Sequence, residues 1–292
     1  MYNNNFSPHV TIIIPCFNGW SYTCECLNSV YKSSYKNYDV IIVNDGSTDI
    51  TSISIKKFFP KVKELNGDGN LWWSKSMNLG FIEALSNNSQ YVLVLNNDVV
   101  INPNTLFNLV NTATLYPNSI VGSIIYNLQK PNIIWSAGGK MKWPWPGEFQ
   151  LGMGEYDHNQ YNGIRNVDWN PGMGTLINTS ILKDLNFYDE KNMPQYLSDV
   201  DLCLRAKKKG YSILINSECI LYNNIENTGG VINNNSSLNF NSIKDMFLSL
   251  RSPDFFRARF TFIYRHCNRS VLLFALFIRY FRLLIYILKR IF

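Results

Sequence analysis

Apolar runs alternate with helix-like stripes along the first half of the chain. Three runs, at 10–15 (VTIIIP), 39–44 (DVIIVN) and 91–96 (YVLVLN), are nearly continuous, as expected of strands buried on both faces. A helical stretch through Cys24, Leu27 and Val30 follows the first run, and positions 77, 81, 84 and 85 share one face of a later helix. This alternation predicts an α/β fold with a mostly parallel sheet flanked by helices.

Start signals predict two further helices. Asn102 is a good N-cap with Pro103 at the first helical position, and apolar residues follow at 106, 109, 110 and 113. Ser198 begins the second helix, which ends at Gly210, and its spacing from Asp201 resembles a capping box.

Polar residues follow the ends of the predicted strands, at Asn18, Asp45, Asn96, Asn97 and Asp98. Ligands of open α/β sheets lie beyond these carboxyl ends, so these residues are candidates for a binding site. Asp45 begins the sequence DGSTD, where a carboxylate can accept hydrogen bonds from a ribose or a nucleobase. The alternative is an Asx turn, with Thr48 or Asp49 capping the next helix.

Two other acids, Asp98 and Asp199, are candidates for metal binding and for general-base catalysis. Asp98 closes Asn96-Asn97-Asp98, and oxygen ligands on a tight turn suit Mg²⁺ or Mn²⁺ with a diphosphate completing the shell. The alternative is a plain strand-end turn. Asp199 lies in the first turn of the helix that begins at Ser198, where the positive helix end keeps a carboxylate ionised, as a general base requires.

Composition excludes several classes of protein. The 292 residues are 46% hydrophobic and 16% charged, which excludes a disordered chain and a collagen-like repeat. Six cysteines without zinc-knuckle spacing predict reduced, buried thiols of a cytosolic protein. The N-terminus has no signal-peptide pattern, and we expect no membrane span because no uncharged apolar run approaches about 20 residues.

The positive charge is concentrated at the C-terminus. Of the net charge of +6, residues 251–292 contribute +8, from nine cations and one acid, and the remaining chain contributes −2. On a helical wheel, the polar residues of this segment form one stripe, and Leu, Ile and Phe occupy the wide remaining surface. The stripe comprises Arg279, Arg282, Tyr286, Lys289 and Arg290. This predicts an interfacial helix on an anionic membrane surface. A helix docked on the protein body or used for self-association is the alternative, and no groove-reading motif points to nucleic acid.

In this order, the motifs TIIIPCFN, VNDGSTD, LNND and SDVDLCLR resemble those of the family 2 glycosyltransferases, which have the GT-A fold. The chain is more similar to a bacterial surface-glycan branch that resembles rhamnosyltransferases. That branch has G-N-L-W-W, here residues 69–73, and P-G-x-G-T, here residues 171–175. The resemblance covers roughly residues 8–230.

The resemblance implies a role for each matching residue. Asp45 would bind the base or ribose of the donor, Asp98 would hold the divalent ion, and Asp199 would be the catalytic base. Further donor-binding residues would be Pro15, Phe17, Asn18, Gly69, Asn70, Trp72, Trp73, Asn96 and Asn97, although core packing is the more usual role of a Trp pair. Acceptor-binding residues would be Gly172, Gly174, Ser198 and Asp201.

The chain departs from the family at three places. Asn96 replaces an Asp that many relatives carry, and residues 221–224 (LYNN) lack the His that helps to bind metal in many of them. Ser198-Asp199 replaces a frequent Glu-Asp pair. These changes retain the candidate base Asp199 and leave fewer side chains that could bind the metal ion.

Together these features predict an inverting glycosyltransferase that uses a nucleotide-diphosphate sugar, with a catalytic domain at 1–235 and a helical, membrane-associating segment at 236–292. Its acceptor would be a lipid-linked or surface glycan, and its location the cytoplasm, peripherally on the inner face of the cell membrane. The donor is open between dTDP-rhamnose and a UDP-hexose. The alternatives are a degenerate nucleotide-sugar-binding module and a sugar nucleotidyltransferase, although the loop PCFNGW lacks the basic, Gly-rich pattern of the latter.

Overall fold

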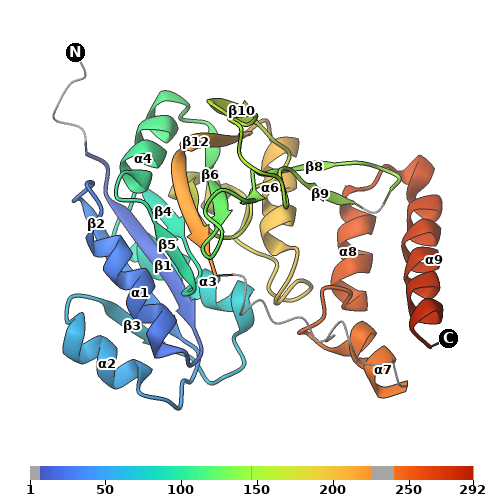
Figure 1. The fold of residues 1–292 in the computed structure, drawn as a ribbon, viewed down its shortest axis with the longest axis horizontal. Helices are drawn as coiled ribbons and strands as arrows, with labels where there is room; N and C mark the ends of the chain where they lie inside the picture. Colours follow the sequence, from blue (N-terminus) through green and yellow to red (C-terminus); the bar gives the residue numbers. More distant parts are fainter. Residues whose placement is uncertain (1–6, 146, 225–239, 292) are drawn as a thin grey trace.

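A computed structural model describes residues 7–145, 147–224 and 240–291, which form a sheet flanked by helices (Figure 1). The main sheet has the strand order β10-β12-β6-β11-β4-β1-β2-β3, with β5 paired to β12 and β7 to β6. Its strands are β1 (Val10–Cys16), β2 (Tyr38–Asn44), β3 (Lys63–Asn66), β4 (Tyr91–Val94), β5 (Val99–Ile101), β6 (Ser119–Asn127), β7 (Ile134–Ser136), β10 (Ile164–Asn166), β11 (Thr175–Asn178) and β12 (Ser212–Asn223). A separate hairpin consists of β8 (Gly139–Met141) and β9 (Glu148–Gln150).

The N-terminal half of the sheet is parallel, as the sequence predicts. β1 pairs in parallel with β2 and β4, and β2 with β3. β11 runs antiparallel between β4 and β6, and β12 is parallel to β6. The first two strands lie within one residue of their predicted ends, but β4 stops at Val94 because the chain turns at Asn97-Asp98 into β5.

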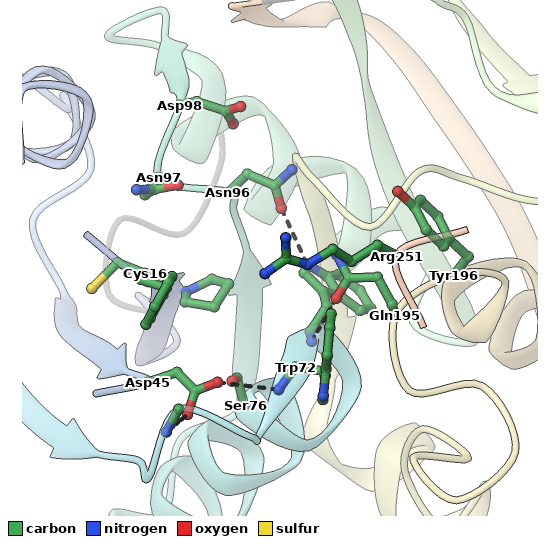
Figure 2. Close-up of a pocket in the computed structure, with 14 residues that line it drawn as sticks. Cys16, Asp45, Trp72, Ser76, Asn96, Asn97, Asp98, Gln195, Tyr196 and Arg251 are labelled. Atoms are coloured by element: carbon green, nitrogen blue, oxygen red, sulfur yellow. Dashed lines mark hydrogen bonds between the residues drawn. The ribbon is translucent and has the colours of Figure 1, made fainter. Parts of the chain in front are cut away.

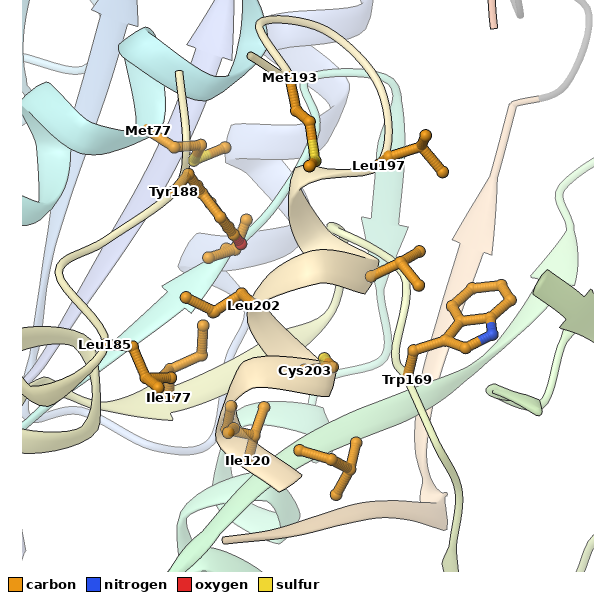
Figure 3. Close-up of a cluster of buried hydrophobic side chains, with 14 of the residues drawn as sticks. Met77, Ile120, Trp169, Ile177, Leu185, Tyr188, Met193, Leu197, Leu202 and Cys203 are labelled. Atoms are coloured by element: carbon orange, nitrogen blue, oxygen red, sulfur yellow. The ribbon is translucent and has the colours of Figure 1, made fainter. Parts of the chain in front are cut away.

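Helices cover both faces of the sheet. α1 (Trp20–Tyr31), α2 (Thr51–Phe58) and α4 (Thr105–Leu115) pack on the face that receives Ile12 and Ile14 of β1. α3 (Trp72–Ser86), α5 (Thr179–Asp184) and α6 (Ser198–Lys208) pack on the opposite face, with Ile13. Alternate residues of one strand therefore enter two separate cores. The core around α6 contains Met77, Tyr188, Leu202 and Cys203 (Figure 3).

One predicted helix start and one predicted cap are wrong, while the helix predicted to begin at Ser198 does begin there. α4 begins at Thr105, because Asn102 accepts a hydrogen bond from the Asn104 N–H and holds Pro103 in a preceding turn. Ser198 is the first residue of α6 and not its cap, and its hydroxyl accepts a hydrogen bond from Ser74 at 2.7 Å. The capping box with Asp201 is therefore absent.

A C-terminal helical segment lies beside the β8–β9 hairpin and α6 (Figure 1). We define it as residues 240–291. It comprises α7 (Phe240–Leu248), α8 (Phe256–His266), a short 3-10 turn (Arg269–Val271) and α9 (Leu272–Ile291). The predicted domain boundary at residue 235 lies outside the described residues.

Helix α9 has a docked face and an exposed apolar face. Ala275, Ile278, Leu283 and Ile287 are buried, and the last two pack with Met246 of α7. Large apolar side chains are exposed on the other side, at Leu273, Phe274, Phe277, Phe281, Leu284 and Leu288. Arg279 pairs with Asp254 in the turn between α7 and α8, so the predicted cationic stripe is not continuous: Arg279 faces inward, while Arg282 and Lys289 are exposed.

Helix α9 also corrects the expectation that no segment is apolar enough for a membrane span. The 22-residue stretch Arg269–Arg290 is long and apolar enough to cross a bilayer, judged by length and composition alone. The stretch is not an uncharged run because two arginines, Arg279 and Arg282, interrupt it, and Arg279 is paired with Asp254.

Candidate active site

A cavity of about 520 Å³ opens at the carboxyl ends of β1, β2 and β4 (Figure 2). It is lined by Pro15, Cys16, Phe17, Asp45, Gly69, Trp72, Trp73, Ser76, Asn96, Asn97, Asp98, Gln195, Tyr196 and Arg251. The polar strand-end residues Asp45 and Asp98 thus border one hollow, because parallel strands bring their carboxyl ends to the same edge.

Asp45 combines a place in the cavity wall with a structural role. Its Oδ1 accepts a hydrogen bond from the Gly69 N–H at 2.8 Å, and its Oδ2 accepts from Leu71 at 2.9 Å and Trp72 at 3.2 Å. The carboxylate therefore holds the loop that begins α3. The contact between Asp45 and the base or ribose of the donor stays a prediction. Three backbone N–H groups already orient the carboxylate that would make this contact. Asp49 accepts from the Thr51 N–H at 2.9 Å, but the cap position of α2 is Ile50, so the predicted cap at Thr48 or Asp49 is wrong by one residue or more.

The adjacent tryptophans form one wall of the cavity. Trp72 has a φ of 59°, a left-handed conformation that is costly for a bulky residue, and its N–H is held by Asp45. Trp73 donates its indole N–H to Asn96 Oδ1 at 3.1 Å and its backbone N–H to Gln195. Its ring also packs on Tyr188, with centroids 5.0 Å apart. Trp73 therefore both packs in the core and joins three parts of the site.

The Asn96-Asn97-Asp98 turn presents one carboxylate. Asn96 accepts from Trp73, and Asn97 donates to Thr23 at 3.1 Å. Asp98 Oδ1 is buried and has no hydrogen-bond partner among the described residues. Burial raises the pKa of Asp98 above its ordinary value. The Asn96 side-chain oxygen thus accepts from the Trp73 indole, a bond that an Asp carboxylate could accept as well.

Asp98 could bind a divalent cation, but few protein ligands would surround that ion. A buried carboxylate oxygen without a partner is a hard ligand of the kind that Mg²⁺ or Mn²⁺ prefers. The described residues contain no cluster of three or more His, Cys, Asp or Glu side chains that could hold a metal. The end of β12 does lie beside Asp98, since the Asn224 N–H donates to the Asp98 carbonyl at 3.1 Å. A cation at this place would therefore depend on Asp98 and on oxygens supplied by its ligand.

Asp199 lies near the Trp73 ring across Gly172; it is half-buried and is not among the residues that line the cavity. Its Oδ2 accepts from the Gly172 N–H at 2.7 Å and its Oδ1 from the Val200 N–H at 2.8 Å. A Cβ at Gly172 would lie 2.4 Å from the Trp73 ring and 3.3 Å from Asp199 Oδ2, so only glycine allows this close approach. Burial raises the pKa of Asp199, and the backbone hydrogen bonds partly offset that rise.

Several predicted site residues serve the scaffold. Asn18 accepts from the Thr48 N–H at 2.8 Å and links the β1 loop to the DGSTD loop. Asn70 is exposed and bonds Asp68, outside the cavity lining. Gly174 bonds Val94 and Ser123 within the sheet.

Asp201 requires a correction. It is fully buried, and its carboxylate accepts hydrogen bonds from Arg205 at 2.7 Å, Arg265 at 2.8 Å and His266 at 2.8 Å. Ser198 is also buried, against Ser74. Neither side chain has a surface left for an acceptor, so both belong to the packing around α6.

Sequence reasoning missed five lining residues: Cys16, Ser76, Gln195, Tyr196 and Arg251. Cys16 follows a predicted strand and could have been found by its place there. Burial, with the charge of Glu64, raises the pKa of its thiol to about 12, so this cysteine is no thiolate nucleophile. Arg251 carried a signal only as one of the C-terminal cations, and nothing local assigned it to the cavity.

Solved structures define the class of this fold as that of the GT-A glycosyltransferases. A mannosyltransferase of Pyrobaculum calidifontis superposes with a TM-score of 0.57 at 15% identity, covering 77% of this chain and 59% of that one. TarS of S. aureus, residues 1–349, gives a TM-score of 0.58 at 17% identity, covering 93% and 87%.

The particular family follows from the sequence. The profile of Glycosyl transferase family 2 matches residues 11–184, more than half of the chain, and the chain belongs to this family. An uncharacterised glycosyltransferase of Rickettsia typhi is 32% identical over 130 residues, which are 43% of this chain and 38% of that protein. Glycosyltransferase GlyA of Streptococcus pneumoniae is 41% identical over 49 residues, 17% of this chain and 7% of that protein. The chain thus matches well under half the length of these relatives.

Proposed function

We propose that this chain is an inverting glycosyltransferase that moves a hexosyl or rhamnosyl group from a nucleotide-diphosphate sugar to a hydroxyl group of a lipid-linked or surface glycan. The observation that carries the proposal is the cavity bordered by Asp45 and Asp98, with the half-buried Asp199 next to its Trp73 wall across Gly172. Two proteins of similar fold support such a donor, since one was solved with GDP-Man and Mn²⁺ and the other with UDP-GlcNAc.

The proposed reaction is a single displacement at the anomeric carbon. Asp199 takes the proton of the acceptor hydroxyl while that oxygen bonds to the carbon, and the bond to the donor phosphate breaks with its electron pair going to the diphosphate. Attack opposite to the leaving group inverts the configuration. The raised pKa of Asp199 makes its carboxylate a better proton acceptor than an exposed one. A divalent cation held by Asp98 would neutralise charge on the diphosphate.

The proposal is tested with a panel of donors: UDP-glucose, UDP-GlcNAc, GDP-mannose and dTDP-rhamnose, each with Mn²⁺ and with EDTA. We expect at least one donor to raise the melting temperature, because a ligand at about 100 times its Kd stabilises the folded state by about 2.7 kcal/mol. We also expect that donor to release its nucleoside diphosphate in a coupled assay. EDTA should weaken both effects if Asp98 holds a cation.

Other outcomes identify the alternatives. Binding with no release or transfer for any donor and acceptor would favour a nucleotide-sugar-binding module. Consumption of a nucleoside triphosphate and a sugar 1-phosphate, with release of pyrophosphate, would favour a nucleotidyltransferase. Absence of any donor binding would contradict the proposal.

The exposed face of α9 supports a location on an anionic membrane surface, peripheral to the cytoplasmic face of the cell membrane. Its apolar side chains lie next to the exposed cations Arg282 and Lys289, the arrangement of an interfacial helix. Crossing the bilayer would require α9 to leave α7, and it would place Arg279 and Arg282 in hydrocarbon at about 2.5–3.5 kcal/mol each. A helix that lies in the interface keeps both its docked and its exposed face.

Replacing Phe277 and Phe281 together with aspartate should lower binding to anionic vesicles about tenfold or more, since each phenylalanine loses about 1.5–3 kcal/mol of apolar burial. Co-sedimentation with phosphatidylcholine vesicles, with and without phosphatidylglycerol, measures this. Phe107→Asp, at an exposed phenylalanine of α4, is the matched control and should bind as the wild type does. Wild-type protein that stays in the supernatant with anionic vesicles would contradict the location. Resistance to carbonate extraction from cell membranes would instead indicate a span.

A further inference from the structure

The cavity has one cationic side chain in its described lining, and that residue lies outside the family match. Arg251 reaches toward the space between Asn96 and Gln195 (Figure 2). Among the described residues its guanidinium has no ion-pair or hydrogen-bond partner, and only its backbone N–H is bonded, to Ser249 Oγ at 3.2 Å. Arg251 thus points into the cavity, and no described residue accepts a hydrogen bond from its guanidinium.

An ordered turn presents Arg251 to the cavity. The turn joins α7 to α8, and within it the Ser252 N–H donates to the Ser249 carbonyl and the Phe255 N–H to that of Ser252. Ser252 is buried, and its hydroxyl accepts from the Asp254 N–H at 3.1 Å. The following helix is tied to α6 by the pair between Arg265 and Asp201. The backbone at Arg251 therefore belongs to an ordered turn, from which its exposed side chain reaches the cavity.

The charges around the cavity indicate what Arg251 would bind. Both oxygens of Asp45 already accept backbone hydrogen bonds, so this carboxylate has no need of a cation. Asp98 is the other acid in the lining, and it can hold only a thin metal shell. A diphosphate carries at least two negative charges, which one weakly held cation would leave incompletely neutralised. The planar guanidinium matches phosphate oxygens with two parallel hydrogen bonds.

We propose that Arg251 binds the diphosphate of the donor and stabilises it as the leaving group. This inference rests on the proposed function and deepens it by naming a residue that the family motifs do not contain. It also gives the C-terminal helical segment a part in the active site, because α7 and α8 place that residue. Charge that develops on the leaving oxygen would meet a cation that the turn between α7 and α8 already places at the cavity.

The experiment compares Arg251→Gln, Arg251→Lys and the wild type by isothermal titration in Mn²⁺ buffer. The probes are UDP, GDP and dTDP, each with its own nucleoside. We expect Arg251→Gln to weaken the Kd of the bound nucleoside diphosphate about 10-fold to 100-fold, the range of a charge-assisted hydrogen bond. Arg251→Lys should lie between, because it keeps the charge and loses the planar fork. Affinity for the nucleoside should not change.

Arg257→Gln is the matched control, since Arg257 belongs to the same segment but donates to Asn192 outside the cavity lining. It should bind all probes as the wild type does. If Arg251→Gln binds the diphosphate as tightly as the wild type, or weakens diphosphate and nucleoside equally, the inference fails while the proposed function stands. If the wild type binds no nucleoside diphosphate at all, the proposed function fails, and the inference with it.

Discussion

Asp199→Asn should lower turnover of the nucleotide-sugar by about 10² or more and leave the affinity for the nucleoside diphosphate unchanged. Asparagine has the same shape, and its oxygen can still accept the hydrogen bond from the Gly172 N–H that lies against Trp73, at the cost of the bond from the Val200 N–H. What it cannot do is take a proton. Steady-state release of the nucleoside diphosphate measures turnover, and titration with the same nucleotide measures affinity.

The pH profile provides a second readout of Asp199. Because burial raises its pKa, activity should fall on acidification at a pH above that expected for an ordinary carboxylate, as the base becomes protonated. The residual activity of Asp199→Asn should lack this acid limb. Asp184→Asn, at an exposed aspartate paired with Lys209, is the matched control and should keep both rate and profile. Unchanged turnover in Asp199→Asn would rule out the base.

Asp201→Asn should lower the free energy of unfolding by about 3–5 kcal/mol, the cost of removing one partner from a buried ion pair. The neutral amide would leave Arg205 and Arg265 without the buried charge that both now contact. The loss should be largest at the junction of α6 and α8, which this side chain joins. Equilibrium denaturation measures the total, and amide exchange of α8 against α1 shows where protection is lost.

The same carboxylate sets an acid limit on stability. Burial alone would raise the pKa of Asp201, but the hydrogen bond from His266 and the charges of Arg205 and Arg265 outweigh it and lower the pKa to about 2. Because the unfolded value is about 3.9, its stabilising contribution is complete above that pH and is lost as the pH falls toward about 2. Asp201→Asn should lack this dependence, whereas Asp184→Asn should melt as the wild type does. Equal stability of Asp201→Asn and wild type would contradict the role of this network.

Local patterns predicted the parts of the site that lie at strand ends. Asp45 and Asp98 each follow a continuous apolar run, and parallel pairing alone brings such positions to one edge. Asp199 and Asp201 show where this reasoning stops. Two residues apart on a helix, they point to different sides, and the local sequence pattern does not tell which of the two is buried in the interior. The packing of α8 decides it, because Arg265 and His266 bury Asp201.

By itself, the sequence determined the α/β class, the parallel half of the sheet and the family motifs, because strand burial and turn chemistry depend on neighbours a few residues away. The tertiary structure alone decided that Arg251 enters the cavity, that Arg279 turns inward to Asp254, and that the Gly172 backbone lies against both Trp73 and Asp199. Each of these depends on helices that are remote in the chain and meet only when their apolar faces are buried together. Such contacts leave no periodic trace in the sequence, because a charged residue has the same local pattern whether it meets solvent, a partner or a ligand.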